Sequence, residues 1–151
     1  MHNLLLITVA RISLSVSAAN ETATPRVWGN FIETSIPGKL ILFGGRRIGG
    51  AVSTVEIIDM NSRSVVISTY LPKLKEIYNV VRLPNQRYAF IGMGDTRYPA
   101  KENLIIVKTD ENLMPIQICE VEDEPFIYGH EFEKALPGKP GHLILTAGDS
   151  I

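Results

Sequence analysis

The chain has 151 residues, 45% of them hydrophobic, and its 15 Lys and Arg residues nearly balance its 16 Asp and Glu residues. This length and apolar fraction suit one ordinary folded domain and exclude wholesale disorder. The formal net charge of −1 argues against a nucleic-acid binder, the single cysteine excludes an internal disulfide framework, and no apolar run approaches the ~20 residues that span a bilayer.

Residues 1–24 allow two interpretations. In the first, the apolar stretch Leu4–Ala10, a candidate cleavage site at Val16–Ala18 and the glycosylation sequon Asn20–Thr22 indicate a signal peptide and the start of a secreted protein. In the second, the segment forms two strands of a repeated β-unit, and a cytoplasmic location is then the expectation.

We favour the second interpretation because the segment matches a later part of the chain without gaps. Asn3–Ile7 resembles Asn103–Val107, which lies 100 residues downstream, and Pro25 is separated from Pro125 by the same interval. A signal peptide normally has a basic residue before its apolar core, and none is present here.

From residue 25 onward the chain repeats with a period of about fifty residues. Trp28, Tyr78 and Tyr128 each follow a β-branched residue and precede a small or polar one. A Pro-Gly or Pro-Asn turn comes next, because Pro fixes φ while Gly and Asn tolerate positive φ. The three turns are Ile36–Lys39, Leu83–Gln86 and Leu136–Lys139.

Each turn leads into a short apolar run that we predict to be a strand. The runs are Leu40–Phe43, Tyr88–Ile91 and Leu143–Thr146. A further pair of predicted strands completes each of the first two units, and Asn or Asp residues supply the turns between them. These pairs are Val55–Asp59 with Ser64–Ser68, and Leu104–Val107 with Met114–Ile118.

No segment has a sustained apolar period of 3.6 residues, so we expect little helix. Four short strands repeated every ~50 residues are typical of β-propeller blades. The sequence therefore predicts an all-β chain whose units are the outer strands of a blade at 1–24, whole blades at 25–74 and 75–124, and the inner strands of a blade at 125–151.

These landmarks resemble the repeats of the Kelch and galactose-oxidase-like propeller superfamily. A Kelch repeat joins an inner strand opened by Pro-Arg and an aromatic residue, a Gly-Lys turn, an apolar strand ending in Gly-Gly, and a strand ending near Tyr-Asp. Pro25–Trp28, Gly38-Lys39, Leu40–Gly45 and Ile58-Asp59 fit this pattern. The resemblance implies Kelch-like blades of four antiparallel strands.

If the first and last strand pairs combine, the chain contains three blade equivalents. Propellers typically have four to eight blades, so three would form an incomplete ring. Either the chain is a piece of a longer protein, which we favour, or two copies pair as a homodimer that completes a six-bladed ring.

We expect no metal, cofactor or catalytic activity. His130 and His142 lack the spacing of zinc ligands. Kelch-like copper radical oxidases need a Tyr–Cys pair, whereas Cys119 falls in a predicted outer strand, where we expect it to be a small buried residue. The inner-strand carboxylates are expected to line a solvated channel rather than to act as a glycosidase pair. They are Glu33, Glu131 and Glu133.

The loops carry the candidate ligand-binding residues. The resemblance implies that the loops after the second strand and before the first strand of each unit share one face, which commonly binds peptide in Kelch-like proteins. Arginine and tyrosine are enriched in binding hot spots. The candidates are Arg26, Arg46, Arg47, Asp95, Arg97 and Tyr98.

The sequence thus predicts a non-catalytic scaffold that binds a protein or peptide through its loop face. The alternative is a piece of a secreted carbohydrate-active or oxidase-like propeller protein. Cleavage after Ala18 and a glycan on Asn20 would favour that alternative.

Overall fold

The computed structural model describes residues 23–94, 104–121, 132–137, 139 and 143–147. The secondary structure of these residues consists of strands and turns, without a helix. The chain divides into two compact units, Met1–Tyr70 and Leu71–Ile151.

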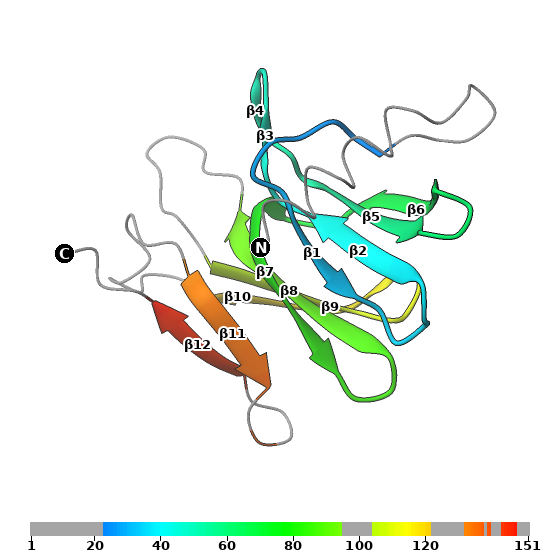
Figure 1. The fold of residues 1–151 in the computed structure, drawn as a ribbon. Coiled ribbons are helices and arrows are strands. Elements are labelled where there is room, and N and C mark those ends of the chain that lie inside the picture. Colours follow the sequence, from blue (N-terminus) through cyan, green and yellow to red (C-terminus); the bar gives the residue numbers. More distant parts are fainter. Residues whose placement is uncertain (1–22, 95–103, 122–131, 138, 140–142, 148–151) are drawn as a thin grey trace. The chain divides into compact units, whose positions relative to one another are not determined.

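The first unit contains a four-stranded antiparallel sheet with strand order β1-β2-β5-β6 (Figure 1). Its strands are β1 (Asn30–Glu33), β2 (Lys39–Phe43), β5 (Thr54–Asp59) and β6 (Ser64–Tyr70). The connection from β2 to β5 forms a small separate hairpin of β3 (Arg46–Arg47) and β4 (Gly50–Ala51).

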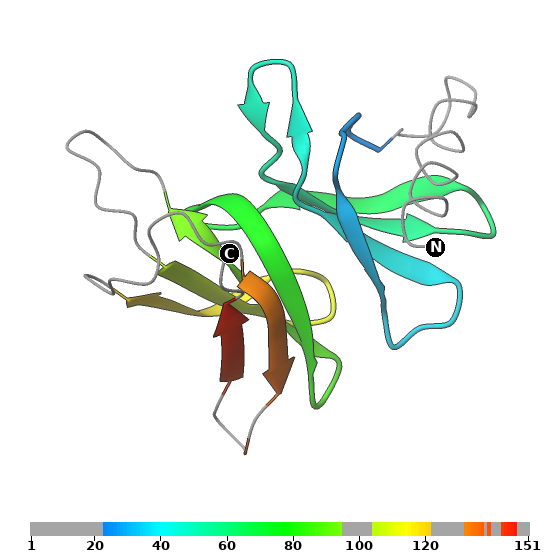
Figure 2. The same cartoon turned by 60° about the vertical axis from the view of Figure 1, so that its left-hand side comes forward.

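The second unit contains a four-stranded antiparallel sheet with strand order β10-β9-β8-β7 and a two-stranded sheet (Figure 2). The larger sheet is built from β7 (Leu74–Leu83), β8 (Arg87–Gly94), β9 (Leu104–Thr109) and β10 (Pro115–Val121). The smaller one pairs β11 (Phe132–Pro137) with β12 (Leu143–Ala147), and β11 lies against β7.

The two larger sheets are equivalent in topology, because in each the four main strands pair in chain order. Ile41 pairs with Ile57 between the second and third strands of the first sheet, and Ile91 pairs with Ile106 at the same place in the second. The prediction of an all-β chain with four-stranded antiparallel units is confirmed. The predicted strand pair within residues 1–24 lies outside the described residues.

The aromatic residues that mark the repeat do not occupy equivalent places in the two sheets. Trp28 precedes β1, whereas Tyr78 lies inside β7. β7 has ten residues to the four of β1, and its pairing with β8 shifts register twice, between Leu74 and Glu76 and between Ile77 and Asn79. The two register shifts change which residues of β7 stand opposite β8, and the fifty-residue spacing alone does not reveal them.

The predicted turns form as their residue types require. Gly38 has φ 78°, and the amide of Lys39 donates to the carbonyl of Ile36 at 3.2 Å, which closes the Pro-Gly turn before β2. Asn85 adopts φ 60° in the turn before β8. In the turn after β5, the Asp59 carboxylate accepts a hydrogen bond from the amide of Asn61 at 2.8 Å.

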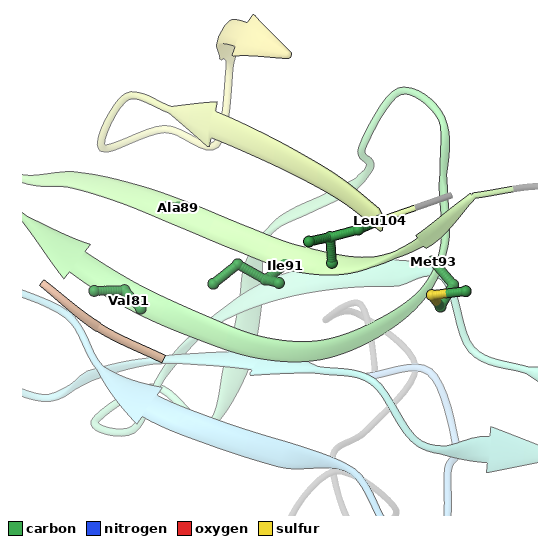
Figure 3. Close-up of a cluster of buried hydrophobic side chains, with 5 residues drawn as sticks. All are labelled: Val81, Ala89, Ile91, Met93 and Leu104. Carbon is green, nitrogen blue, oxygen red and sulfur yellow. The ribbon is translucent and has the colours of Figure 1, made fainter. Parts of the chain in front are cut away.

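Apolar side chains cover both faces of each large sheet. One face of the second sheet carries the cluster of Val81, Ala89, Ile91, Met93 and Leu104 (Figure 3). Strand alternation places Phe90 and Val107 on its other face, where both are fully buried. In the first sheet Leu42 and Ile58 pack with Ala23 on one face, while Ile41 and Ile57 are buried on the other. Sheets that are apolar on both faces are suited to packing between two other layers.

Candidate functional site

The β3–β4 hairpin extends beyond the first sheet from the end where β2 finishes and β5 begins (Figure 1). Arg46 pairs with Ala51 and Arg47 pairs with Gly50, and Ile48 and Gly49 form the two-residue turn. A Cβ atom added at Gly49 or Gly50 would meet nothing within 4 Å. No described atom therefore covers the hairpin tip at these two glycines, and a partner can approach it there.

Two cationic groups and one aliphatic group are exposed on this hairpin. Arg46 and Arg47 are both exposed, and Ile48 is 103% exposed. Neither arginine forms a salt bridge with a carboxylate of the described residues. An exposed isoleucine beside two arginines without an acidic partner gives the hairpin both apolar and cationic contact groups.

The segment before β1 carries an exposed aromatic residue, and its backbone runs beside the hairpin. Val27 and Arg46 exchange two backbone hydrogen bonds, of 2.8 and 2.9 Å, so the segment runs beside the first residue of the hairpin. Val27 is 56% exposed and Trp28 is 79% exposed. We call these five residues the Trp28–Ile48 surface: Val27, Trp28, Arg46, Arg47 and Ile48.

Trp28 is held in an uncommon backbone conformation, with φ 54°. Left-handed φ is sterically unfavourable for a bulky side chain, and such residues persist where the surrounding structure holds them in place. Here a Cβ on Gly45 would lie 2.6 Å from the carbonyl oxygen of Val27 and 2.9 Å from Cα of Gly29. Gly45 thus lets the backbone of residues 27–29 lie directly against the base of the hairpin.

A buried ion pair anchors the start of this segment to the sheet. Arg26 Nη2 lies 2.6 Å from Glu56 Oε2 of β5, and the two side chains are only 3% and 2% exposed. Arg26 Nη1 donates to the carbonyl of Gly44 at 3.0 Å, and Glu56 accepts from the amide of Thr24 at 2.9 Å. Burial lowers the pKa of Arg26 from its usual value, and the adjacent Glu56 carboxylate opposes that shift.

The predicted ligand-binding residues of the first unit have different surroundings. Arg46 and Arg47 are both exposed on the hairpin, whereas the side chain of Arg26 is buried. The remaining predicted site residues, Asp95, Arg97 and Tyr98, lie outside the described residues.

Sequence reasoning did not include Trp28 and Ile48 in the candidate site. Trp28 was interpreted as a landmark of the inner strand, although tryptophan is one of the residue types most enriched in binding hot spots. The composition offers one relevant signal, since Trp28 is the chain's only tryptophan.

In the second unit, Lys73, the residue before β7, has a left-handed backbone as Trp28 does. Lys73 has φ 63°, and its Nζ lies 2.7 Å from Glu120 Oε2 at the end of β10. The side chains are 58% and 30% exposed, so this ion pair is a surface contact and contributes little to stability.

Cys119 corrects one sequence-based expectation. We predicted a small buried residue, but Cys119 is an exposed free thiol. It lies in β10, which is the edge strand of its sheet, and neighbouring positions of that strand are exposed as well. Residues Met114–Glu120 are all exposed, so both faces of this part of β10 are uncovered, which its apolar residues did not indicate.

Two further structural features bear on function. Within residues 23–94, 104–121 and the shorter C-terminal stretches, no three His, Cys, Asp or Glu side chains gather as a metal-binding group would. The part of the chain that the structure describes also contains no helix long and apolar enough to span a membrane.

No protein-family model matches the chain, and no curated protein matches its sequence significantly. The interpretation as Kelch-like blades therefore depends on the internal repeat and on the topology of the two sheets.

Proposed function

We propose that this chain is a non-catalytic interaction scaffold of Kelch-like propeller blades, which binds a protein or peptide through the Trp28–Ile48 surface. The observation that carries the proposal is the hairpin. Its Arg46 and Arg47 are exposed and have no carboxylate partner among the described residues, and the backbone segment that bridges to it carries the exposed Trp28. Tryptophan and arginine are among the residue types most enriched in the hot spots of protein interfaces.

The topology of the sheets supports the assignment to propeller blades. Both large sheets are four-stranded meanders with corresponding pairings, and both carry buried apolar side chains on their two faces. A blade inside a propeller packs against a neighbouring blade on each face, so its sheet needs apolar residues on both.

The chemistry of the surface supports binding rather than catalysis. Guanidinium groups stay protonated at neutral pH, and indole and aliphatic groups neither attack an electrophile nor accept a proton under these conditions. The same groups are effective in recognition, because Arg forms bidentate hydrogen bonds and Trp supplies a large rigid contact area.

Site-specific photo-crosslinking tests this proposal. We would introduce a photoreactive amino acid at Ile48 of the full chain and, as a matched control, at Ser62, which is exposed in the turn after β5. We expect a discrete crosslinked partner at position 48 only, and we expect the purified partner to bind the unmodified chain. Equal crosslinking at both positions, or none at position 48, would contradict binding through this surface.

A further inference from the structure

We infer that the edge strand β6 of one copy of this chain pairs with the edge strand β10 of a second copy, so that copies join head to tail through main-chain hydrogen bonds. Neither strand is part of the Trp28–Ile48 surface. The inference therefore goes beyond the proposed function and does not depend on it.

Both strands have one free side in the part of the chain that the structure describes. Among these residues, β6 pairs only with β5 and β10 pairs only with β9. The N–H and C=O groups on the free side of an edge strand can form hydrogen bonds with a strand of another chain. Each copy can therefore accept one neighbour at β6 and another at β10.

The two edges have few of the features that normally prevent the addition of a strand. Charged residues, proline and β-bulges protect most natural edges. β6 contains no charged residue, and β10 contains only Glu120, next to its last position. Pro115 is the first residue of β10, and each strand has its register shift in its first half, beside Val65–Ile67 in β6 and between Pro115 and Gln117 in β10. The second half of each strand is regular.

Pairing of these strands would cover exposed apolar side chains on both. Every second residue of β6 from Val66 to Tyr70 is exposed, and in and beside β10 so are Met114, Ile116 and Ile118. An antiparallel alignment with Val66 opposite Ile118 also places Tyr70 opposite Met114. Apolar pairs that lie directly opposite each other are the main side-chain contribution to strand pairing.

Charge at the strand ends favours β10 as the partner of β6. Arg63 precedes β6 and Lys73 follows it, whereas Glu111 precedes β10 and Glu120 lies near its end. Lys73 and Glu120 already form a surface ion pair within one chain, but Arg63 and Glu111 are exposed and form no salt bridge within the described residues. An antiparallel alignment brings each cationic end of β6 to an acidic end of β10. Antiparallel pairing of either strand with itself would bring like charges together, which is unfavourable.

Pairing between unlike edges does not stop at two copies. Each contact uses the β6 of one copy and the β10 of another, and leaves a free β10 and a free β6 at the two ends of the assembly. Such a head-to-tail contact extends into a chain or a larger ring. Two strands of seven residues form a narrow interface, so we expect the association to be reversible and to increase with concentration.

Two variants of the full chain, each with one edge blocked, test this pairing. Val66→Lys places a charge on β6 and Ile118→Lys places one on β10, both at exposed positions. Sedimentation equilibrium of the unmodified chain should give a mean mass that rises with concentration past twice the 16.7 kDa of one chain. Each variant alone should lose this rise. An equimolar mixture should form a complex that contains both variants, because β10 of the first can pair with β6 of the second.

Ser35→Lys is the matched control, since it adds the same charge at an exposed position between β1 and β2. This variant should associate as the unmodified chain does. A mean mass of the unmodified chain that does not change with concentration would overturn the inference. Association of Ile118→Lys alone would show that β6 pairs with itself, association of Val66→Lys alone would show the same for β10, and either result would also overturn it.

A thiol crosslink tests the alignment independently, even if a lysine variant fails to fold. With Val66 opposite Ile118, Val65 lies opposite Cys119, which is the chain's only cysteine. A short bismaleimide should therefore join Val65→Cys chains into a ladder of two, three and more copies. Thr69→Cys, four positions further along β6, is the control and should give no ladder. No ladder with Val65→Cys, or an equal ladder with both variants, would overturn the inference.

Discussion

Gly45 combines a left-handed backbone with a close contact, and each of these requires glycine. Its φ is 85°, and a Cβ at this position would lie 2.6 Å from the carbonyl oxygen of Val27. We expect Gly45→Ala to destabilise the fold by at least ~1–3 kcal/mol from backbone strain alone, and to displace the segment that carries Trp28. Urea unfolding and the emission of Trp28 measure the two effects.

Gly49 is the matched control for this substitution. It also has positive φ, 102°, but a Cβ there would meet no atom within 4 Å. Gly49→Ala should therefore introduce backbone strain without displacing residues 27–29, and the emission of Trp28 should stay unchanged. If Gly45→Ala and Gly49→Ala change the emission of Trp28 equally, the contact between Gly45 and residues 27–29 does not position the tryptophan.

The ion pair of Arg26 and Glu56 gives a second prediction at the scale of single residues. Removal of one member leaves a buried charge without its partner, so we expect Glu56→Ala to lower the free energy of unfolding by about 3–5 kcal/mol. The double variant Arg26→Met with Glu56→Leu removes both charges and should recover most of that loss. Chemical denaturation compares them, and a double variant no more stable than Glu56→Ala would contradict this explanation.

Neither the Arg26–Glu56 ion pair nor the contact of Gly45 with residues 27–29 could be predicted from the sequence. The Pro25-Arg26 pair indicated the start of a strand, but its partner Glu56 is thirty residues away and stands among apolar neighbours in β5. Likewise, the left-handed backbone of Trp28 and the close approach of Gly45 to residues 27–29 left no signal in the local residue pattern. Contacts of this kind depend on tertiary placement, which local residue patterns do not specify.

At the scale of strands, the core of the second unit depends most on β8. Ile91 is fully buried in the cluster of Figure 3, on a strand that pairs with both β7 and β9. We expect Ile91→Ala to destabilise the unit by about 2–5 kcal/mol, because it removes buried methyl groups and leaves a cavity. Ile116→Ala in the edge strand β10 is the control. Because Ile116 is 50% exposed, this substitution should lower the melting temperature far less than Ile91→Ala does.

The strands were largely predictable because their apolar runs are bounded by turn residues. Leu40–Phe43 and Tyr88–Ile91 fall inside β2 and β8, and the predicted outer pairs fall at β5 with β6 and at β9 with β10. The β3–β4 hairpin was missed, because two residues per strand are too few to establish an alternating pattern. The candidate site was thus only partly predictable, through the residue types of Arg46 and Arg47.

At the scale of the whole molecule, each of the two large sheets has exposed apolar residues on an edge strand. Val66 and Tyr70 are 46% and 68% exposed on β6, and Ile116 and Ile118 are 50% and 40% exposed on β10. Both are edge strands of sheets that do not close. Exposed edges of this kind promote association with further strands or with another copy of the chain.

The hypothesis that two copies complete a six-bladed ring makes a definite prediction about mass. Light scattering should give twice the 16.7 kDa of one chain, with a far-UV spectrum dominated by β-structure. Because a dimer dissociates on dilution, its melting temperature should fall as the protein concentration is lowered. A monodisperse, well-folded species of 16.7 kDa would contradict the dimer if its melting temperature does not depend on protein concentration. Three blade equivalents would then be stable without a second copy.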